Sequence, residues 1–575
     1  MTMTMMMLLT LKRGLVVRGP LTTLPVRSFS AVGGQSLSVS SLPGRFFSSS
    51  PSSSSTERPS SSSSPKQKRN KNNKKTGTNP QQEQQQKPKQ IRIGKGHHLF
   101  VACLPGLEPI LSQELKRLGI LHSGREGSGG FNIREASVET LLRCHLYLGT
   151  ASHVFLRCGR PFLARTFPEL VRRVSKLPWQ EWLPEYDMSG MDDNDSILPK
   201  IRVVSKKSKL MHTTGVAERV QRGIERVLGR TETPYGDDHR NESSFSMDSA
   251  SMTTEDNDDD QDRPQLLVRV YRDKVQLSID TSATPLHQRG YRLETGKAPL
   301  REDIAHAMLL AGGCGDTFHN VMDPFCGSGT LCLEAATILA GLPPGRLRSS
   351  PLQGTVLQDV KLWDELKKDA EEVASFVDVG GRVLGSDRDE GVIQAAKNNA
   401  DRAGVLDRID FVHSSVSASP WFDGNNQSDE NVDKEQVSSH RRPDGSLLVA
   451  TNPPYGKRLS KNAVGKHNRS DKHLWPLYQT FGKKFQLIQQ NQPTEARCGA
   501  LMLTHDTDLA RRSGLAMEAK FTTDHGGLKV SAMKIIEKAK QSEERSDTLP
   551  KDTETDTDGE RVVESDLDLG KTKEA

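Results

Sequence analysis

The feature that most constrains the fold is a short glycine turn between a strand and a helix. Residues 318–322 form an apolar run typical of a strand, Asp323 ends it, and residues 331–340 are rich in the Leu, Ile and Ala of a helix. Between them, Gly327 and Gly329 let the backbone curl tightly and bring N–H groups close to a ligand. The positive end of the helix dipole adds to this attraction. The stretch therefore predicts a strand–turn–helix unit that binds a cofactor.

Two other kinds of cofactor site share this unit, and the residues disfavour both. A phosphate-binding P-loop needs Lys and then Ser or Thr after its last glycine, whereas Gly329 is followed by Thr330 and Leu331. A dinucleotide fingerprint requires Gly or Ala where this chain has Cys332, and an acid about 20 residues further on. ATP hydrolysis and nicotinamide binding are therefore not expected. Standing alone, the turn could still be an ordinary strand–helix connection.

S-adenosylmethionine fits the turn better, because Rossmann-like methyltransferases add a second carboxylate at the end of the next strand. Residues 383–387 are a short apolar run that ends in Asp387, and a helix follows that stops near Gly404. We expect Asp387 to accept hydrogen bonds from the ribose hydroxyls. The predicted cofactor-binding residues are Asp323, Pro324, Cys326, Gly327, Gly329, Thr330 and Asp387.

A second motif, Asn452-Pro-Pro-Tyr455, follows the apolar strand 447–450. The two prolines restrict the backbone, so the Asn452 side chain points in a defined direction. If its oxygen and the Pro453 carbonyl accept the two hydrogens of an exocyclic amine, the amine lone pair can face the sulfonium methyl. Tyr455 can stack on the base, which is worth about 1–3 kcal/mol. In isolation the motif would be a proline-rich turn or ligand. The predicted catalytic residues are Asn452, Pro453, Pro454 and Tyr455.

Residues 97–537 resemble the RNA guanine-N2 methyltransferases that carry a THUMP domain, above all the N-terminal, RlmL-type half of bacterial large-subunit (23S) rRNA methyltransferases of the RlmKL type. Six stretches carry the resemblance, in the order that the family has them. They are Leu99-Phe-Val-Ala-Cys-Leu-Pro-Gly-Leu-Glu108, Leu277-Ser-Ile-Asp-Thr-Ser282, Leu286-His-Gln-Arg-Gly-Tyr-Arg292, Ala298-Pro-Leu-Arg-Glu302, residues 323–330 and residues 452–459.

The resemblance implies an α/β fold, with a Rossmann-like class I methyltransferase domain built on a mostly parallel seven-stranded sheet. It also implies methyl transfer from S-adenosylmethionine to the exocyclic N2 of guanosine in large-subunit rRNA, which would be organellar rRNA if residues 1–56 are a transit peptide. A tRNA guanine-N2 methyltransferase, an adenine-N6 methyltransferase and a non-catalytic RNA-binding assembly factor remain open. The chain departs from the family at 411–415, where the acid expected near the adenine amine is missing. A second methyltransferase half has no counterpart after residue 537, so one activity is implied.

The domain organisation follows from the resemblance and from composition, since only 34% of the 575 residues are hydrophobic and 26% are charged. Much of the chain should therefore lie outside any core. We expect an organelle transit peptide (1–56), a disordered basic and Gln-rich linker (57–96), a ferredoxin-like segment (97–137), a THUMP RNA-binding domain (138–285) with an acidic disordered insertion (231–263), the methyltransferase domain (286–538) and a disordered charged tail (539–575). A second acidic loop is expected at 423–444.

The first 56 residues contain Arg, Lys and many Ser and no acid, which is the pattern of an organelle transit peptide. The apolar run at 5–9 is too short to span a bilayer. We expect a mitochondrial protein, with the plastid as an alternative, and a Ser-rich cytosolic tail also remains open. No membrane partner is expected.

A helix predicted over 215–228 offers a candidate RNA contact. Val216, Val220, Ile224 and Val227 form an apolar stripe, and arginines form a second, basic stripe. The alternative is a solvated face whose arginines pair with acids of the same helix. The candidate RNA-binding residues are Lys206, Lys207, Lys209, Arg219, Arg222 and Arg226.

The seven cysteines show no Cys-x-x-Cys pair, and no His-Glu-x-x-His motif occurs, so a metal is not expected. Reduced thiols are the simplest interpretation. Base-carbon methyltransferases use a cysteine nucleophile, but Cys326 lies inside the glycine turn, where it would face the cofactor. A packing role is therefore favoured for Cys326.

Overall fold

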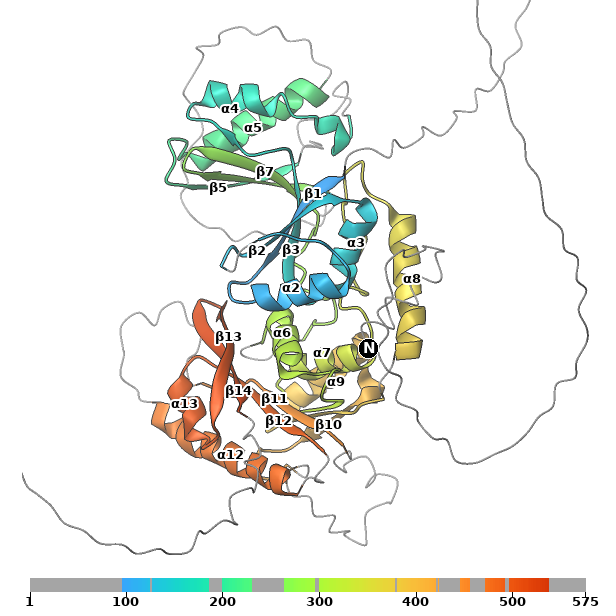
Figure 1. Ribbon diagram of the computed structural model, residues 1–575, viewed down its shortest axis with the longest axis vertical. Coiled ribbons are helices and arrows are strands. Elements are labelled where there is room, and N and C mark those ends of the chain that lie inside the picture. Colours follow the sequence, from blue (N-terminus) through green and yellow to red (C-terminus); the bar gives the residue numbers. More distant parts are fainter. Residues whose placement is uncertain are drawn as a thin grey trace, which may run out of the picture. The chain divides into compact units, whose positions relative to one another are not determined.

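The computed structural model describes residues 96–124, 127–185, 199–229, 263–294, 299–377, 380–419, 422, 445–455, 471–491 and 496–536 (Figure 1). The predicted transit peptide, nearly all of the linker, the acidic insertion except its last residue, the second acidic loop and the C-terminal tail lie outside these residues. Two seven-stranded sheets carry the described part of the chain. Its helices are all too short or too polar to cross a bilayer.

The first sheet begins with three antiparallel strands. β1 (His97–Cys103) pairs with β2 (Gly130–Ala136) on one side and with β3 (Ala151–Arg157) on the other. Helix α2 (Glu108–Arg117) connects β1 to β2, and α3 (Val138–Tyr147) connects β2 to β3 and packs on all three strands. The predicted boundary at residue 137 therefore falls inside one packed unit.

The same sheet continues through β3 into strands of the predicted THUMP range. β3 pairs in antiparallel fashion with β7, β7 with β6, and β6 in parallel with β5, which gives the order β2-β1-β3-β7-β6-β5. Helices α4 and α5 pack on each other, and α5 packs on β5 (Figure 1). The ferredoxin-like and predicted THUMP segments thus share one sheet. The bounds are β4 Phe162–Leu163, which also pairs with β7, α4 Phe167–Val174, β5 Lys200–Lys206, α5 Thr213–Leu228, β6 Gln265–Tyr271 and β7 Lys274–Asp280.

The second sheet has the order β10-β9-β8-β11-β12-β14-β13, with β14 antiparallel to its neighbours and the other described pairings parallel. The chain moves outward from β8 to β10 on one side and then continues from β11 on the other, so the order reverses between β8 and β11. The predicted mostly parallel seven-stranded sheet is confirmed. The strands are β8 Asn320–Asp323, β9 Val383–Asp387, β10 Ile409–His413, β11 Leu447–Thr451, β12 Cys498–Thr504, β13 Met517–His525 and β14 Leu528–Ile535.

Both faces of the second sheet are covered. Leu448 and Ala450 of β11 belong to one hydrophobic core, and Leu447 and Val449 belong to another, because successive side chains of a strand point to opposite faces. Helices α6 to α9 contribute to the first core, and α12 and α13 contribute to the second. Their bounds are α6 Glu302–Gly312, α7 Thr330–Leu339, α8 Val360–Val377, α9 Glu390–Arg402, α12 Trp475–Gln490 and α13 Thr507–Arg512, with short 3-10 turns at Trp179–Glu181, Leu406–Arg408 and Asp471–Leu474.

Candidate active site

The glycine turn joins β8 to α7 at the carboxyl edge of the second sheet. Gly327 and Gly329 have φ values of 52° and 89°, in the left-handed region that favours glycine. A Cβ on Gly329 would lie 2.9 Å from Leu333 Cδ1 and 3.0 Å from Ala396 Cβ, so packing as well as conformation requires glycine there. A Cβ on Gly327 would meet no atom within 4 Å. The backbone at Gly327 therefore faces open space that a ligand can use.

Asp387 ends β9 and fixes the turn from the neighbouring strand. Its Oδ2 accepts a hydrogen bond from Gly327 N at 3.1 Å, and its Oδ1 accepts one from Asp389 N at 3.1 Å. Cys326 N donates to the Ser386 carbonyl at 3.0 Å. Each carboxylate oxygen has a further lone pair for another donor. The structure thus brings the second predicted acid to the glycine turn.

Asp323 is linked to the strand that carries the Asn452 motif. The register aligns Val449 of β11 with Met322 of β8, so both strands end at the same edge. Asp323 is only 2% exposed, and its Oδ1 accepts hydrogen bonds from Thr451 Oγ1 at 2.7 Å and Phe325 N at 3.1 Å. Burial raises the pKa of Asp323 to about 7, although these two donors act in the opposite direction. Thr451 therefore connects the two motifs directly.

Asn452 presents an unused acceptor at this junction. Its Oδ1 is a buried atom with no hydrogen-bond partner in the described part of the chain. A buried polar atom without a partner costs free energy, so a site that leaves one is suited to a ligand that donates. Pro453, whose carbonyl is the second predicted acceptor, is buried beside it.

Two further contacts support the corner formed by Asn452–Tyr455. The Tyr478 hydroxyl of α12 donates to the Pro454 carbonyl at 3.4 Å, and the Tyr455 ring centre lies 5.2 Å from that of His505. Burial raises the pKa of Tyr455 above its ordinary value, and a hydrogen bond with the Asn452 side chain acts in the opposite direction. Tyr455 therefore stays a neutral phenol near pH 7.

The arrangement fits S-adenosylmethionine and a base. Open α/β sheets bind ligands beyond the carboxyl ends of the strands, where the strand order reverses, and that point lies between β8 and β11. The space at Gly327, the carboxylate of Asp387 and the unpaired Asn452 Oδ1 lie at or just beyond the carboxyl ends of β8, β9 and β11, which are neighbours in the sheet. One edge of the sheet thus holds both predicted motifs.

Pro324 and Cys326 are buried within the turn. Burial raises the pKa of the Cys326 thiol well above its ordinary value, and its Sγ lies 3.6 Å from the Gly327 carbonyl. Because the thiolate is the nucleophilic form of cysteine, this environment favours packing over covalent chemistry for Cys326.

The end of β10 shows what occupies the place of the missing acid. Ser414 N donates to the Asp387 carbonyl at 2.9 Å, and the hydroxyls of Ser415 and Ser417 lie 2.9 Å apart. His413 Nε2 lies 3.1 Å from the Arg388 carbonyl. Among the described residues that follow β10, hydroxyl groups therefore replace a carboxylate.

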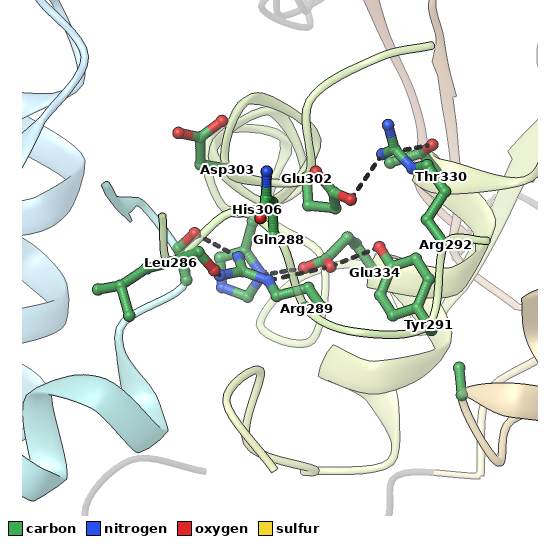
Figure 2. Close-up of polar contacts among 12 residues, drawn as sticks. Leu286, Gln288, Arg289, Tyr291, Arg292, Glu302, Asp303, His306, Thr330 and Glu334 are labelled. Carbon is green, nitrogen blue, oxygen red and sulfur yellow. Dashed lines mark hydrogen bonds and ion pairs between the residues drawn. The ribbon is translucent and has the colours of Figure 1, made fainter. Parts of the chain in front are cut away.

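A buried polar cluster is centred on Glu334 of α7, the helix that follows the glycine turn, and sequence reasoning missed it. Figure 2 shows Arg289, Tyr291 and His306 directed toward the Glu334 carboxylate of α7. Tyr291 Oη donates to Oε1 at 2.9 Å, Arg289 Nε lies 3.4 Å from the same oxygen, and His306 Nδ1 lies 2.8 Å from Oε2. Burial alone would raise the pKa of Glu334, but Arg289 and His306 hold it at about 2. Glu334 is therefore an anion fixed by several donors.

The Glu334 cluster extends to helix α2, which belongs to the part of the chain that carries the first sheet. His306 Nε2 lies 3.6 Å from Glu114 Oε1 of α2. Glu114 in turn accepts hydrogen bonds from Gly149 N at 2.7 Å and Thr150 N at 3.1 Å. The helix that follows the cofactor turn is thus tied through two carboxylates to the segment between α3 and β3.

Arg292 supports the turn from its other end. Its Nη2 donates to Thr330 Oγ1 at 3.1 Å and pairs with Glu302 Oε1 at 3.0 Å (Figure 2). Burial raises the pKa of Glu302 to about 7. The Thr330 hydroxyl, a predicted cofactor contact, is therefore bonded to the protein itself.

The predicted RNA contacts lie on α5 and at the end of β5. Val216, Val220 and Ile224 are buried as expected, and Leu228 is buried where Val227 is only partly so. Arg219 pairs with Glu218 and lies over the Phe167 ring, with its guanidinium 5.0 Å from the ring centre. The other predicted contacts are exposed, namely Lys206, Lys207, Lys209, Arg222 and Arg226.

Comparison with solved structures shows that this chain has a methyltransferase fold. SMU.472, solved in complex with SAH, covers 77% of this chain and 98% of its own, with 24% identity and a TM-score of 0.57. A predicted N6-adenine-specific DNA methylase from Listeria monocytogenes covers 76% and 96%, with 25% identity and a TM-score of 0.53.

The matches to protein-family models are more specific than the likeness to solved structures. Residues 289–531 match the RMKL-like methyltransferase domain, and residues 98–155 match the RlmL ferredoxin-like domain. These matches confirm the predicted resemblance and S-adenosylmethionine as the cofactor. The ferredoxin-like match extends past the predicted boundary at residue 137.

Curated proteins also match parts of the chain. Ribosomal RNA large subunit methyltransferase K/L of Legionella pneumophila (strain Lens) is 28% identical over 439 residues, which are 75% of this chain and 52% of that protein. The enzyme of the same name from Shewanella amazonensis is 34% identical over 241 residues, or 40% and 30% of the two chains. The chain spans about half the length of the curated relatives it matches.

Proposed function

We propose that this protein transfers a methyl group from S-adenosylmethionine to the exocyclic N2 of guanosine in organellar large-subunit rRNA. The observation that carries the proposal is the buried, unpaired Asn452 Oδ1 at the edge that also holds the glycine turn. The names of the curated relatives support rRNA as the substrate.

The residues of the turn would hold the methyl donor. The backbone at Gly327 has space for it, and Asp387 would accept hydrogen bonds from the ribose hydroxyls. When bound, S-adenosylmethionine supplies an electrophilic methyl group on a sulfonium sulfur. The buried Asp323, linked to Thr451, holds the two strand ends in register for it.

The residues of the corner would hold the base. Asn452 Oδ1 and the Pro453 carbonyl would accept the two amine hydrogens, which directs the lone pair of the nitrogen toward the methyl group. Tyr455 would stack on the ring. Orientation of this kind supplies much of the barrier reduction in a direct displacement, so no side chain has to remove the proton before transfer.

The basic residues of α5 and β5 would contact the RNA backbone, in a segment that we propose to be a THUMP domain. Arg222 and Arg226 are exposed on α5, Lys206 is exposed at the end of β5, and Lys207 and Lys209 are exposed just beyond it. Neutralised phosphates release counterions, which favours binding without sequence preference.

We also propose that the protein acts in the mitochondrion, on the basis of the acid-free, Arg- and Ser-containing residues 1–56. Fluorescence microscopy of the chain fused to a fluorescent protein, with and without these residues, tests the proposal. Plastid or cytosolic signal from the whole chain would contradict it.

The decisive experiment maps modified nucleosides by mass spectrometry in organellar rRNA and tRNA, with and without the protein. We expect N2-methylguanosine to disappear from large-subunit rRNA when the protein is removed. Loss of N2-methylguanosine from tRNA, or of N6-methyladenosine, would identify the other enzyme classes. Unchanged nucleosides together with retained RNA binding would indicate an assembly factor.

A further inference from the structure

A basic surface is formed by the 3-10 turn before α12, the first residue of α12 and the last residue of α13. It consists of Lys472, Trp475 and Arg512, which we call the Trp475 cluster. The guanidinium carbon of Arg512 lies 3.9 Å from the centre of the Trp475 ring, and Lys472 Nζ lies 5.8 Å from the same centre. Trp475 is half-buried, whereas Lys472 and Arg512 are exposed. Two cations thus converge on one aromatic ring at the surface.

The acids closest to Arg512 in sequence are engaged elsewhere. Asp508 precedes Arg512 by four residues, a spacing that favours an ion pair on a helix, yet its carboxylate pairs with Arg511 at 2.8 Å. Asp506 caps α13 by accepting from Asp508 N at 2.8 Å. Helix α12 contains no Asp or Glu. Among the described residues, no ion pair neutralises Arg512 or Lys472, so the cluster keeps its positive charge.

Two contacts place the Trp475 cluster beside the corner formed by Asn452–Tyr455. Tyr478, three residues after Trp475 on α12, donates to the Pro454 carbonyl. On the other side, His505 contacts the Tyr455 ring and lies two residues before α13, whose last residue is Arg512. A helix rises about 1.5 Å per residue, so Trp475 begins about 4.5 Å along the axis from Tyr478. The cluster therefore borders the place where the target base would be held.

We propose that the Trp475 cluster binds the phosphodiester backbone of the RNA strand next to the target nucleotide. The inference rests on the proposed function and names where the RNA passes. A base whose amine reaches Asn452 must leave its stack, so the flanking phosphates lie at the rim of the site. Electrostatic attraction between the cations and those phosphates supplies the affinity.

The contact with Trp475 gives Arg512 a role that a mobile surface arginine would not have. Stacking on the aromatic face restricts the guanidinium before the RNA arrives. Less side-chain freedom is then lost on binding. The N–H groups at the guanidinium edge stay available for a bidentate contact with phosphate. Lys472 adds a second, less directional charge. In a purely structural alternative, the stack would only join α13 to α12.

The test compares Arg512→Gln with the double variant Asp508→Asn/Arg511→Gln, a matched control that removes the neighbouring ion pair and leaves no free carboxylate four residues before Arg512. Lys472→Gln is the second test variant, because it removes an exposed charge without touching the contact between α12 and α13. Binding of a fluorescein-labelled single-stranded RNA of mixed sequence is followed by anisotropy across a salt series, and methylation of large-subunit rRNA is measured in parallel.

For Arg512→Gln and for Lys472→Gln, we expect several-fold weaker RNA binding and a slope of log K against log salt that is smaller by about 0.7, the value for one phosphate contact on a single strand. KM for rRNA should rise while kcat is retained. The double variant Asp508→Asn/Arg511→Gln should match the wild type in every measurement.

The outcomes are distinguishable. Wild-type affinity and salt slope in both Arg512→Gln and Lys472→Gln, with methylation intact, would overturn this inference and leave the proposed function standing. If Arg512→Gln proves unstable in thermal unfolding, Lys472→Gln decides. A wild-type protein that neither binds nor methylates RNA would overturn the proposed function itself.

Discussion

The hydroxyl of Thr451 provides a sharp test of how the two strand ends are joined. Thr451→Val keeps the shape of the side chain but removes the donor that lies 2.7 Å from Asp323 Oδ1. Asp323 would then keep only the Phe325 N–H among the donors described above. The effect of the substitution must depend on whether the Asp323 carboxyl is ionised.

The magnitude follows from the charge state of Asp323. A hydrogen bond to a charged group contributes about 1.5–3 kcal/mol, and one to a neutral group about 0.5–1.5 kcal/mol. The pKa of Asp323 depends on the difference between these two contributions, so losing the bond should raise it by about one further unit, at about 1.36 kcal/mol per unit. Because burial already raises this pKa from 3.8 to about 7, the contribution of Asp323 to the free energy of unfolding is fully present below pH 3.8 and is lost as pH rises through about 7. In Thr451→Val this loss of stability should extend to higher pH, because the pKa of Asp323 would be higher than in the wild type.

Thermal midpoints at about pH 5.5 and about pH 8.5 measure the difference. For a domain of this size, about 1 kcal/mol shifts the midpoint by about 2–4 °C. Thr451→Val should cost roughly twice as much at the higher pH as at the lower one. Thr451→Ser keeps the hydroxyl and should resemble the wild type.

Thr504→Val is the matched control, because Thr504 is also fully buried and its hydroxyl donates at 2.8 Å to the backbone carbonyl of Asp506, which does not titrate. Its cost should be the same at both pH values. If Thr451→Val shows the same pH-independent loss as Thr504→Val, Asp323 is not the titrating partner and the reasoning fails.

Other substitutions test the site and its support. Asn452→Ala should bind S-adenosylmethionine normally but lower the single-turnover methylation rate by about 10²–10³-fold; a wild-type rate would exclude it from catalysis. Asp387→Ala should weaken cofactor binding, measured by calorimetry, by about 1.5–3 kcal/mol, and unchanged affinity would remove it from the site. Gly329→Ala should lower the thermal midpoint, since its Cβ would lie 2.9 Å from Leu333, whereas an unshifted midpoint would show that the turn relaxes freely. Glu334→Gln should destabilise the fold by about 3–5 kcal/mol because Arg289 loses its buried partner; a neutral result in urea unfolding would contradict this.

Short local patterns made the two motifs predictable. Gly329 and the prolines after Asn452 limit the backbone wherever they occur, so their turns could be inferred without knowledge of the rest of the chain. Asp387 was found because it ends an apolar strand. The structure adds that the carboxylate of Asp387 is bonded to Gly327, a contact that spans two strands.

The buried cluster could not be predicted, because its members come together only in the folded chain. An acid inside the apolar helix 330–339 was a visible signal at Glu334. Its partners Arg289 and His306 lie on other segments, and charge alone does not select them among the many arginines and histidines of the chain. The shared first sheet was missed for a similar reason, since strand pairing over long separations leaves no local pattern.

The pairing of β3 with β7 has a consequence for synthesis. β3 is complete at Arg157, but the strand that covers its second edge begins at Lys274. On the ribosome, β1, β2 and β3 can pair early. The second edge of β3 then stays unpaired until the intervening chain and β7 have been synthesised. An unpaired edge strand is a template for wrong pairing with another chain, and long-range strand pairing is slow. Chaperone dependence of the nascent chain should therefore begin after β3 and end once β7 has left the ribosome.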